Sequence, residues 1–332
     1  MKRIIIILIV ACFFMINFSC KNKNARLKVD VSKIDLIIKI KRYEKDLFSI
    51  NLYNFKQGIT ALEDKYPFFL EGIGKDTSEI SSLQKFITDP LSIQLYKDCQ
   101  KQYPNVDDLE LDLTNAFKHY KFYFPEISIP KVYTYISGLE FQFPIKFTGN
   151  VLSISLDMYL GSQYKIYKDI GIPTYKTYKL RKESIVPDCM KEIAKNYLPL
   201  KMDNTFLSSM IEAGKIIYFT DAMMPEMNDS LKIDYTSQQI KWCETNEANV
   251  WAYFIDNKLL YNTDVVLINK FVGEAPFTAA FSKLSPPRVA VWIGWQIIRK
   301  YMDNFPHISL KELMKDNDAQ KILMKSKYKP KK

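Results

Sequence analysis

Carboxylates on predicted helices are the residues of this sequence best suited to carry chemistry. Asp188 and Glu192 lie four positions apart, which places both side chains on one face of a helix and within reach of one cation. Glu212 follows on the next predicted helix. Oxygen ligands of this kind suit a hard cation, and a peptidase or glycosidase of the hydrolase class could use them. The simpler interpretation, which we favour, is a solvated acidic edge.

Glu247 is an acid on an apolar helix face. Its neighbours at spacings of three and four are Ile240, Cys243, Val250 and Phe254. A buried carboxylate without a partner is unfavourable by several kcal/mol, so it must be paired, protonated or bound to a cation. Arg288 and Arg299 flank the last long apolar helix, and the sequence predicts one of them as the ion-pair partner. A pocket residue is the alternative.

The sequence contains few residues that could form other kinds of catalytic site. Asp157 ends a predicted strand, where functional residues often gather. The two histidines, His119 and His307, are far apart and neither has ligand spacing around it, which disfavours a histidine zinc site or a Ser-His-Asp triad. No phosphate-binding glycine loop is present. We therefore predict no catalytic residue set, no metal ligand set and no cofactor.

The N-terminus predicts export. Residues 1–3 are cationic at two positions, and residues 4–16 form an apolar run that is shorter than the roughly 18 to 20 residues that span a bilayer. Ser19 and Cys20 then precede polar residues, as in bacterial lipoprotein signals, which this segment resembles. Asn17 and Phe18 depart from that pattern, and an ordinary signal peptide is the alternative. The resemblance implies removal of residues 1–19 and a diacylglycerol on Cys20.

Composition predicts a globular domain behind that anchor. The chain has 332 residues, 47% of them hydrophobic, and a formal charge of +10. Bases and aromatics alternate over residues 175–182, but in an exported protein we expect anionic lipid or glycan near such a face and no nucleic acid. Three isolated cysteines, Cys99, Cys189 and Cys243, do not make a disulfide framework and are predicted as buried thiols.

Periodicity predicts one α+β domain over residues 34–332, predominantly helical, behind a tether of residues 20–33. Its N-terminal part (34–128) starts with a strand over 35–43 and continues in helices over 52–66, 78–88, 91–103 and 106–124. Its strand region (129–181) contains strands over 129–137 and 151–156 in a small antiparallel sheet. Its C-terminal part (182–332) contains helices over 183–198, 205–219, 236–257 and 288–302. Gly294, between Trp292 and Trp295, predicts close approach of another backbone.

Several blocks resemble the gliding-motility lipoprotein GldB family. They are residues 156–161 (LDMYLG), 172–175 (IPTY), 185–188 (IVPD), 212–215 (EAGK), 242–247 (WCETNE), 250–254 (VWAYF), Arg288, 292–298 (WIGWQII) and 326–330 (SKYKP). The resemblance implies an envelope lipoprotein required for gliding, working with other motility proteins that move adhesins and with type IX secretion. It implies a place at the periplasmic face or on the cell surface.

The element order also resembles zincin-type metallopeptidases. Asp188, Cys189 and Glu192 stand where that family has its His-Glu-x-x-His ligands and base, and Glu212 stands at its third ligand. Without the imidazoles the resemblance implies that peptidase activity is lost. We therefore expect a non-enzymatic lipoprotein whose helical half presents a binding surface. The alternative is a metal-dependent envelope hydrolase.

Overall fold

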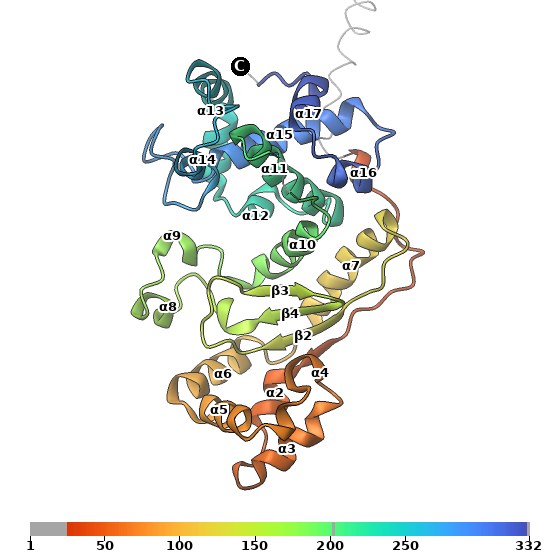
Figure 1. Ribbon diagram of the computed structural model, residues 1–332, viewed down its shortest axis with the longest axis vertical. Helices are drawn as coiled ribbons and strands as arrows, with labels where there is room; N and C mark the ends of the chain where they lie inside the picture. The colour runs from red at the N-terminus through yellow and green to blue at the C-terminus, as the bar shows by residue number, and fades with distance from the viewer. Residues whose placement is uncertain (1–24, 201–202, 331–332) are drawn as a thin grey trace, which may run out of the picture.

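A computed structural model describes residues 25–200 and 203–330. The fold is a predominantly helical α+β fold, as predicted, with a four-stranded sheet between two groups of helices (Figure 1). Helices α2 to α6 lie on one side of the sheet, and α10 to α17 lie on the other. The predicted signal peptide and Cys20 lie outside the described residues.

The sheet is mixed, so the predicted antiparallel sheet is wrong for two of its pairings. Strands β1 (Ile40–Arg42), β2 (Lys131–Tyr135), β3 (Ile145–Thr148) and β4 (Val151–Ser155) stand in the order β1-β2-β4-β3. β2 pairs in parallel with β1 and with β4, while β3 and β4 form an antiparallel hairpin. Edge strand β3 adds a reversal that brings β4 back alongside β2. Gly149 has φ +59° in the two-residue turn, which favours glycine.

The first group of helices connects β1 to β2. It comprises α2 (Tyr43–Phe48), α3 (Phe55–Glu63), α4 (Pro67–Leu70), α5 (Thr77–Thr88) and α6 (Pro90–Gln102), with 3-10 turns η3 (Leu52–Asn54) and η4 (Ile73–Lys75). Helix α7 (Asp107–Tyr123) completes the connection but packs on the other side of the sheet, against α10 and α11 (Figure 1). Asp76 and Asp89 cap α5 and α6 by accepting backbone N–H bonds. The predicted helices in this part are present. The strand predicted over 35–43 shortens to three residues.

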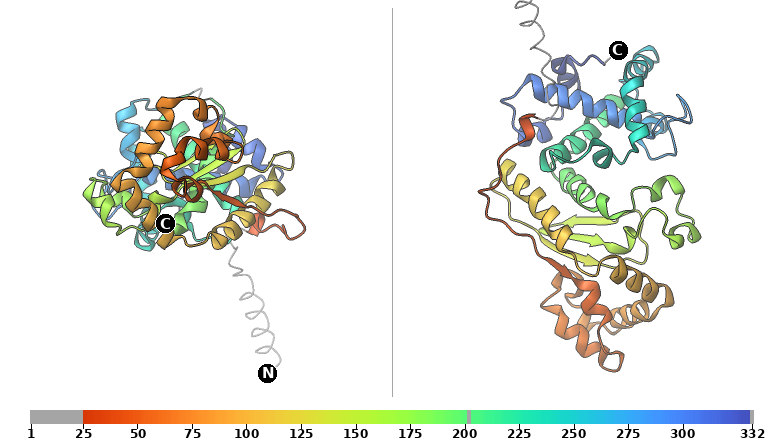
Figure 2. Two further views of the ribbon diagram at one scale, coloured as in Figure 1. Left: turned by 90° about the horizontal axis from the view of Figure 1, so that it is seen from below. Right: turned by 180° about the vertical axis from the view of Figure 1, so that it is seen from behind.

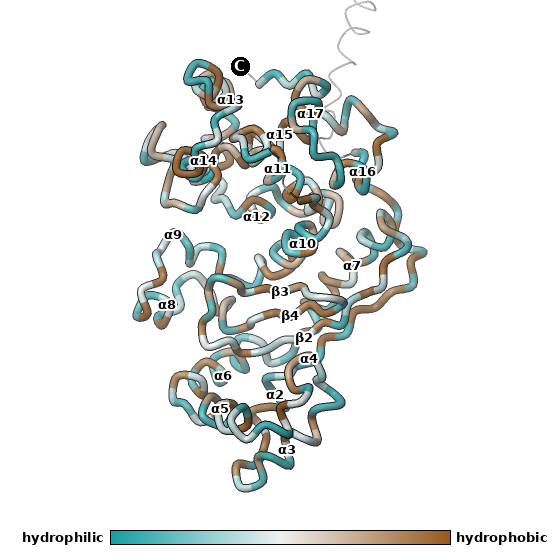
Figure 3. The backbone as a smooth tube through the Cα atoms, in the orientation of Figure 1, coloured by the Kyte–Doolittle hydropathy of each residue, from teal (hydrophilic) through white to brown (hydrophobic). Residues whose placement is uncertain are grey.

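The second group follows the sheet. After η5 (Leu156–Met158) come α8 (Lys165–Asp169), α9 (Thr174–Thr177), η6 (Lys182–Ser184), α10 (Ile185–Lys195), α11 (Phe206–Met223), α12 (Asp229–Ile233), α13 (Ser237–Asp256), α14 (Val265–Val272), α15 (Val289–Asn304), α16 (Leu310–Lys315) and α17 (Ala319–Ser326). The capping box predicted at Thr236 and Gln239 opens α13. Figure 3 shows hydrophobic residues along the strands and in α14.

Helices α11 and α15 cross at two glycines. A Cβ on Gly294 would lie 2.0 Å from the carbonyl oxygen of Met210, and one on Gly214 would lie 2.4 Å from the carbonyl carbon of Gly294. The close approach predicted at Gly294 is therefore confirmed. Trp292 and Trp295 flank it and are buried. The predicted buried thiols Cys99, Cys189 and Cys243 are free and buried.

The start of the described chain lies against the second group of helices. The 3-10 turn η2 (Ala25–Leu27) lies beside α16, and the chain then runs down the side of the molecule to β1 (Figure 1 and the right panel of Figure 2). Leu27 and Ile38 are buried along this path. Residues 25–33, which the sequence predicts as part of a tether, thus lie against the domain.

Candidate binding cleft

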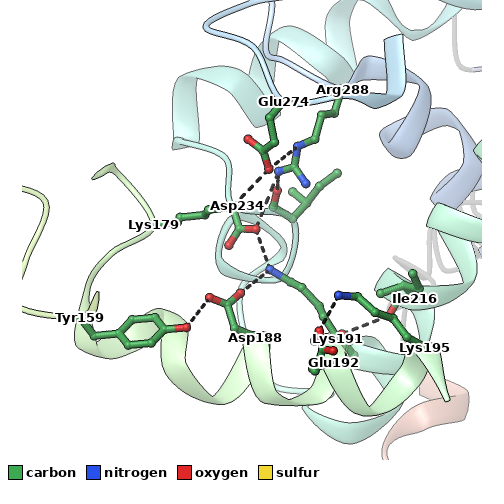
Figure 4. Close-up of polar contacts among 12 residues, drawn as sticks. Tyr159, Lys179, Asp188, Lys191, Glu192, Lys195, Ile216, Asp234, Glu274 and Arg288 are labelled. Atoms are coloured by element: carbon green, nitrogen blue, oxygen red, sulfur yellow. Dashed lines mark hydrogen bonds and ion pairs between the residues drawn. The ribbon is translucent and has the colours of Figure 1, made fainter. Parts of the chain in front are cut away.

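A cleft of about 430 Å³ opens between the sheet and the second group of helices. Its walls come from the β2–β3 loop, α10, α11, the end of α14 and the start of α15. Four basic side chains (Lys179, Lys191, Lys195 and Arg288) and four acidic ones (Asp188, Glu192, Asp234 and Glu274) line it. Phe141 and Phe143 stand at its edge, 39% and 58% exposed. The cleft therefore carries both positive and negative side chains and has aromatic residues at one edge. Figure 4 shows the polar contacts among the charged side chains.

Lys191 joins two carboxylates in the cleft. Its Nζ lies 2.6 Å from Oδ2 of Asp234 and 3.1 Å from Oδ1 of Asp188. The buried Tyr159 hydroxyl donates to Oδ2 of Asp188 over 3.0 Å. Asp188 and Lys191 come from one turn of α10, whereas Asp234 follows α12, so the ion pair ties two helices together.

The pKa values of Asp188 and Asp234 are shifted in opposite directions. Burial raises the pKa of Asp188 above its ordinary value, although the charge of Lys191 acts against it. Burial would also raise the pKa of Asp234, but the charges of Lys191 and Arg288 outweigh it and lower the pKa. Asp188 is therefore the carboxylate of this pair that takes up a proton first as the pH falls.

Arg288 lies between two carboxylates and donates to neither. Its Nη2 lies 3.8 Å from Oδ2 of Asp234, and its Nε lies 3.7 Å from Oε1 of Glu274. Nη2 donates instead to the carbonyl of Ile233 over 2.7 Å. Nε of Arg288 and Oδ1 of Asp234 are buried, and within the described part of the chain neither makes a hydrogen bond. One buried donor and one buried acceptor of the cleft wall thus lack a hydrogen bond.

Both residues also have left-handed backbone conformations. Asp234 has φ 60° and Arg288 has φ 53°. Asp tolerates this region, but for Arg it costs free energy that the surrounding structure must offset. Residues held in such conformations are concentrated at binding sites. Asp234 ends α12 and Arg288 precedes α15, and the two residues are neighbours in the cleft wall, since Nη2 of Arg288 lies 3.8 Å from Oδ2 of Asp234.

Glu274 completes the ionic set. It accepts from Lys179 Nζ over 3.2 Å. Burial acts to raise the pKa of Glu274, but Arg288 and Lys179 outweigh it and hold the pKa below its ordinary value. Glu274 therefore remains an anion at neutral pH and keeps Arg288 oriented at this wall of the cleft.

A family model described as gliding motility protein GldB matches residues 24–330. The chain belongs to this family. Neither a search of curated proteins nor a search of solved structures finds a match. The family label also marks its members as lipoproteins, which supports membrane attachment in the envelope.

Over residues 25–200 and 203–330, no helix is both long and apolar enough to cross a membrane.

Asp188, Glu192 and Glu212, the three carboxylates of the alternative cation site, are not brought together in this GldB-family fold. Asp188 and Glu192 line the cleft, but Glu192 pairs with Lys195 and Asp188 with Lys191. Glu212 lines a different cavity, of about 40 Å³, together with Lys215. Within the described ranges no group of three His, Cys, Asp or Glu residues is arranged to hold a metal. The resemblance to zincins stays a prediction, since no solved structure matches.

Glu247 is buried as predicted, but both predicted ion-pair partners are wrong. It accepts from Nε1 of Trp292 over 3.2 Å and from the hydroxyl of Tyr328 over 2.9 Å. Neutral donors thus satisfy this carboxylate, and Tyr328 fixes the segment after α17 against α13. Arg288 belongs to the cleft instead.

Arg299 belongs to a buried network that the sequence prediction missed. Asp221 accepts from Nε and Nη2 of Arg299, from Nζ of Lys232 and from Nε1 of Trp295, over 2.7 to 2.9 Å. Arg299 also forms two bonds of 2.8 Å to Asp229. The signal was present in the sequence, because Asp221 interrupts an apolar run on α11. The network joins α11, α12 and α15 and holds the wall that carries Arg288.

Asp157 lies in η5, directly after β4, and holds the β2–β3 loop in place. Its fully buried carboxylate accepts from the backbone N–H groups of Ser137 and Leu139, over 2.9 and 2.7 Å, and from the hydroxyls of Ser137 and Ser155. Leu139 has φ 69°, so these bonds hold a strained turn in the β2–β3 loop. That loop carries Phe141 and Phe143 to the cleft, and Asp157 therefore acts on the cleft through the loop.

Proposed function

We propose that this GldB-family chain is a non-enzymatic component of the gliding machinery, held on an envelope membrane by lipid on Cys20. In this proposal the cleft binds a polypeptide segment of another envelope protein. Family membership supports the role in gliding motility. The cleft supplies the binding site, and the rest of the fold holds its walls in place.

One observation carries the binding proposal: Nε of Arg288 and Oδ1 of Asp234 are buried, and neither makes a hydrogen bond within the described residues. Leaving a buried donor and acceptor unsatisfied costs about 1–3 kcal/mol each, which a ligand with both functions recovers on binding. A peptide group offers a carbonyl for Arg288 and an N–H for Asp234. Phe141 and Phe143 at the edge suit an apolar side chain next to that peptide group.

The ion pairs of the cleft support a binding role over catalysis. Asp188, Asp234, Glu192 and Glu274 each pair with a lysine of the same cleft. Asp234 and Glu274, whose pKa values are held low by neighbouring cations, are poor proton donors, and a lysine kept charged by carboxylates is a poor nucleophile. For Lys191, burial lowers the pKa but Asp234 and Asp188 outweigh it, so the pKa is raised and the amine stays charged.

Site-specific photocrosslinking in gliding cells tests the proposal. A crosslinker at Phe143 should trap a specific envelope protein, and the crosslink should disappear in Arg288→Met and in Asp234→Asn. A crosslinker at Tyr53, which is 97% exposed in the other group of helices, is the matched control and should not trap that protein. Cells with Arg288→Met should stop gliding at normal protein levels. A crosslink that persists in both variants would contradict binding in the cleft.

One observation favours the alternative, a metal-dependent hydrolase. Asp188 is a buried carboxylate in a cleft, and burial raises its pKa, as a general acid requires. Metal analysis of the purified protein distinguishes the two proposals. A stoichiometric ion that is lost in Asp188→Asn and in Glu192→Gln would support the hydrolase and overturn the non-enzymatic proposal.

Lipid attachment has its own test. Labelling of cells with a palmitate analogue should mark the wild-type protein and should be absent in Cys20→Ala. Label that persists in Cys20→Ala would refute the lipid assignment and leave the cleft proposal standing.

A further inference from the structure

We infer that one end of the molecule lies against the headgroups of an anionic bilayer. This end, here called the lysine face, comprises Lys300 on α15, Lys325 on α17, and Lys327 and Lys329 after α17. The inference rests in part on the proposed lipid at Cys20. Its main test measures binding in the absence of that lipid, so failure of one does not imply failure of the other.

The first step is where the anchored end of the chain meets the fold. The guanidinium of Arg26 donates to the carbonyls of Met302 and Ile308, the latter over 2.5 Å. Arg26 is therefore fixed at the C-terminal end of α15. Cys20 precedes Arg26 by six positions, and an extended chain spans at most roughly 3.6 Å per residue, or about 22 Å in total. A lipid on Cys20 thus holds this end of the molecule near the bilayer.

The second step is which side chains lie at that end. Arg26 bonds to carbonyls on both sides of Phe305, and Nζ of Lys325 lies 5.8 Å from the Phe305 ring. Nδ2 of Asn304 donates to the carbonyl of Ser326 over 2.7 Å. These contacts place the end of α17 directly beside the end of α15. Figure 1 shows α16, α17 and the first described residues together at one end of the molecule.

The third step is charge and exposure. Lys300, Lys325, Lys327 and Lys329 are all exposed, whereas the ion pairs near this end use Lys311 and Lys321. Asp303 is exposed on the same helix end and offsets one positive charge. Met324 is 71% exposed beside Lys325 and adds an apolar side chain. Lysines around an exposed apolar residue match the chemistry of an anionic lipid surface.

The expected affinity is modest without the anchor. Each lysine near an anionic surface strengthens binding by roughly fivefold, so four lysines give weak, salt-sensitive binding. Attachment through Cys20 makes the contact intramolecular, and a weak surface then suffices to orient the protein. In that orientation helices α3 and α5, at the opposite end in Figure 1, point away from the bilayer. The cleft lies between the two ends and stays open to partners.

Vesicle sedimentation of the mature chain carrying Cys20→Ser tests the lysine face. We expect binding to vesicles of phosphatidylcholine with phosphatidylglycerol, weaker binding at high salt, and none to phosphatidylcholine alone. The triple variant Lys300→Glu, Lys325→Glu, Lys327→Glu should bind the anionic vesicles at least roughly 100-fold more weakly. The matched control reverses three exposed lysines at the other end, Lys85, Lys97 and Lys101, and should bind within about twofold of the parent chain.

Equal weakening in both triple variants would show an effect of net charge alone and would overturn the inference. Absence of binding to anionic vesicles would overturn it as well. In native membranes, amine-reactive labelling should modify Lys97 and Lys101 fully and Lys325 and Lys327 poorly. Labelling of all four to the same extent would also contradict the lysine face.

Discussion

Buried charges in this protein are held by partners from distant parts of the chain. Asp221 and Lys232 are fully buried, and Arg299 is 8% exposed by its side chain. Two cations and the indole of Trp295 share one carboxylate, so every polar atom of Asp221 is bonded. Such a network is a weak source of net stability, because desolvation offsets most of the attraction. Removing one member is costly, because the others stay buried without a partner.

We therefore predict that Asp221→Asn lowers the free energy of unfolding by about 3–5 kcal/mol. The amide keeps the shape of the carboxylate but removes the counter-charge of buried Lys232 and leaves Arg299 with Asp229 alone. Asp229→Asn is the control, because Asp229 is 27% exposed and its loss should cost only about 1 kcal/mol. Urea unfolding followed by circular dichroism measures both. Equal losses of unfolding free energy in the two variants would show that burial of the carboxylate does not determine the cost of removing its charge.

The lowered pKa of Lys215 leads us to predict that the free energy of unfolding increases with pH. Burial lowers its pKa from 10.5 to about 8, while its Nζ donates to the carbonyl of Asp316. Between these two values the unfolded chain holds a proton that the folded protein has released, so stability increases as the pH rises. From about pH 7 to about pH 9.5, wild type should gain about 2 kcal/mol relative to Lys215→Met. Unfolding free energies of both proteins at the two pH values measure the gain. A constant difference between them would contradict it.

At the residue scale, the sequence predicted the burial of Glu247 correctly but not the side chains that it contacts. Periodicity placed Glu247 on a buried face, which is correct, but charge alone favoured Arg288 and Arg299 as partners. The pattern does not reveal that Asp221 already engages Arg299, or that Trp292 and Tyr328 supply neutral donors. In the cleft, Asp188, Glu192 and Arg288 were candidates from the sequence. Asp234 and Glu274 were not, because they lie in segments that join the cleft only through tertiary folding.

At the scale of elements, local signals sufficed for helices and failed for strand pairing. The capping box at Thr236 and the apolar stripes of α10, α11 and α15 depend on neighbouring residues, and these helices formed as predicted. Strand direction depends on residues far apart. β1 pairs with β2 across the whole first group of helices, and β3 adds a reversal within a short loop. The mixed sheet could therefore not be predicted from local sequence patterns.

The crossing of α11 and α15 predicts a strong effect of one methyl group. Gly294→Ala would place a Cβ 2.0 Å from the backbone oxygen of Met210, so the helices must separate. We expect a loss of about 3 kcal/mol or more in the free energy of unfolding, and a lower melting temperature. Gly58→Ala in α3 is the control. Its Cβ would lie 2.4 Å from Cγ2 of Ile50, so this half-buried side chain must turn away, but no backbone has to move and alanine favours the helix.

In the control, stability should change by less than about 1 kcal/mol. Calorimetry of both variants measures the difference. A similar, small effect of Gly294→Ala would show that the helix crossing has room for a side chain, against the geometry of the two backbones.

At the scale of the whole molecule, the apolar core falls into two clusters of unequal size. The larger cluster joins α7, α10, α11 and α15 and extends to α6 through Leu95 and Cys99. The smaller cluster consists of Tyr43, Leu47, Phe55, Ile59, Tyr66, Leu70, Ile80, Ile87 and Tyr133. Partly buried Phe48 and Phe86 pack against both clusters. Smaller cores bury less apolar surface per residue, so α3 to α5 are expected to open more readily than the rest.

Native-state hydrogen exchange should resolve this difference. Amides of α3 and α5 are expected to exchange through openings that cost less free energy than those of α11 and α15. Ile59→Ala truncates a fully buried side chain in the smaller cluster. It should lower the free energy of opening measured by the amides of α3 and α5 by about 2 kcal/mol or more, and leave that of α11 unchanged. Ile293→Ala, equally buried in α15, should instead increase exchange in both parts, because loss of the larger cluster removes the sheet that supports the smaller one. Uniform acceleration in both variants would show that the molecule opens as one unit.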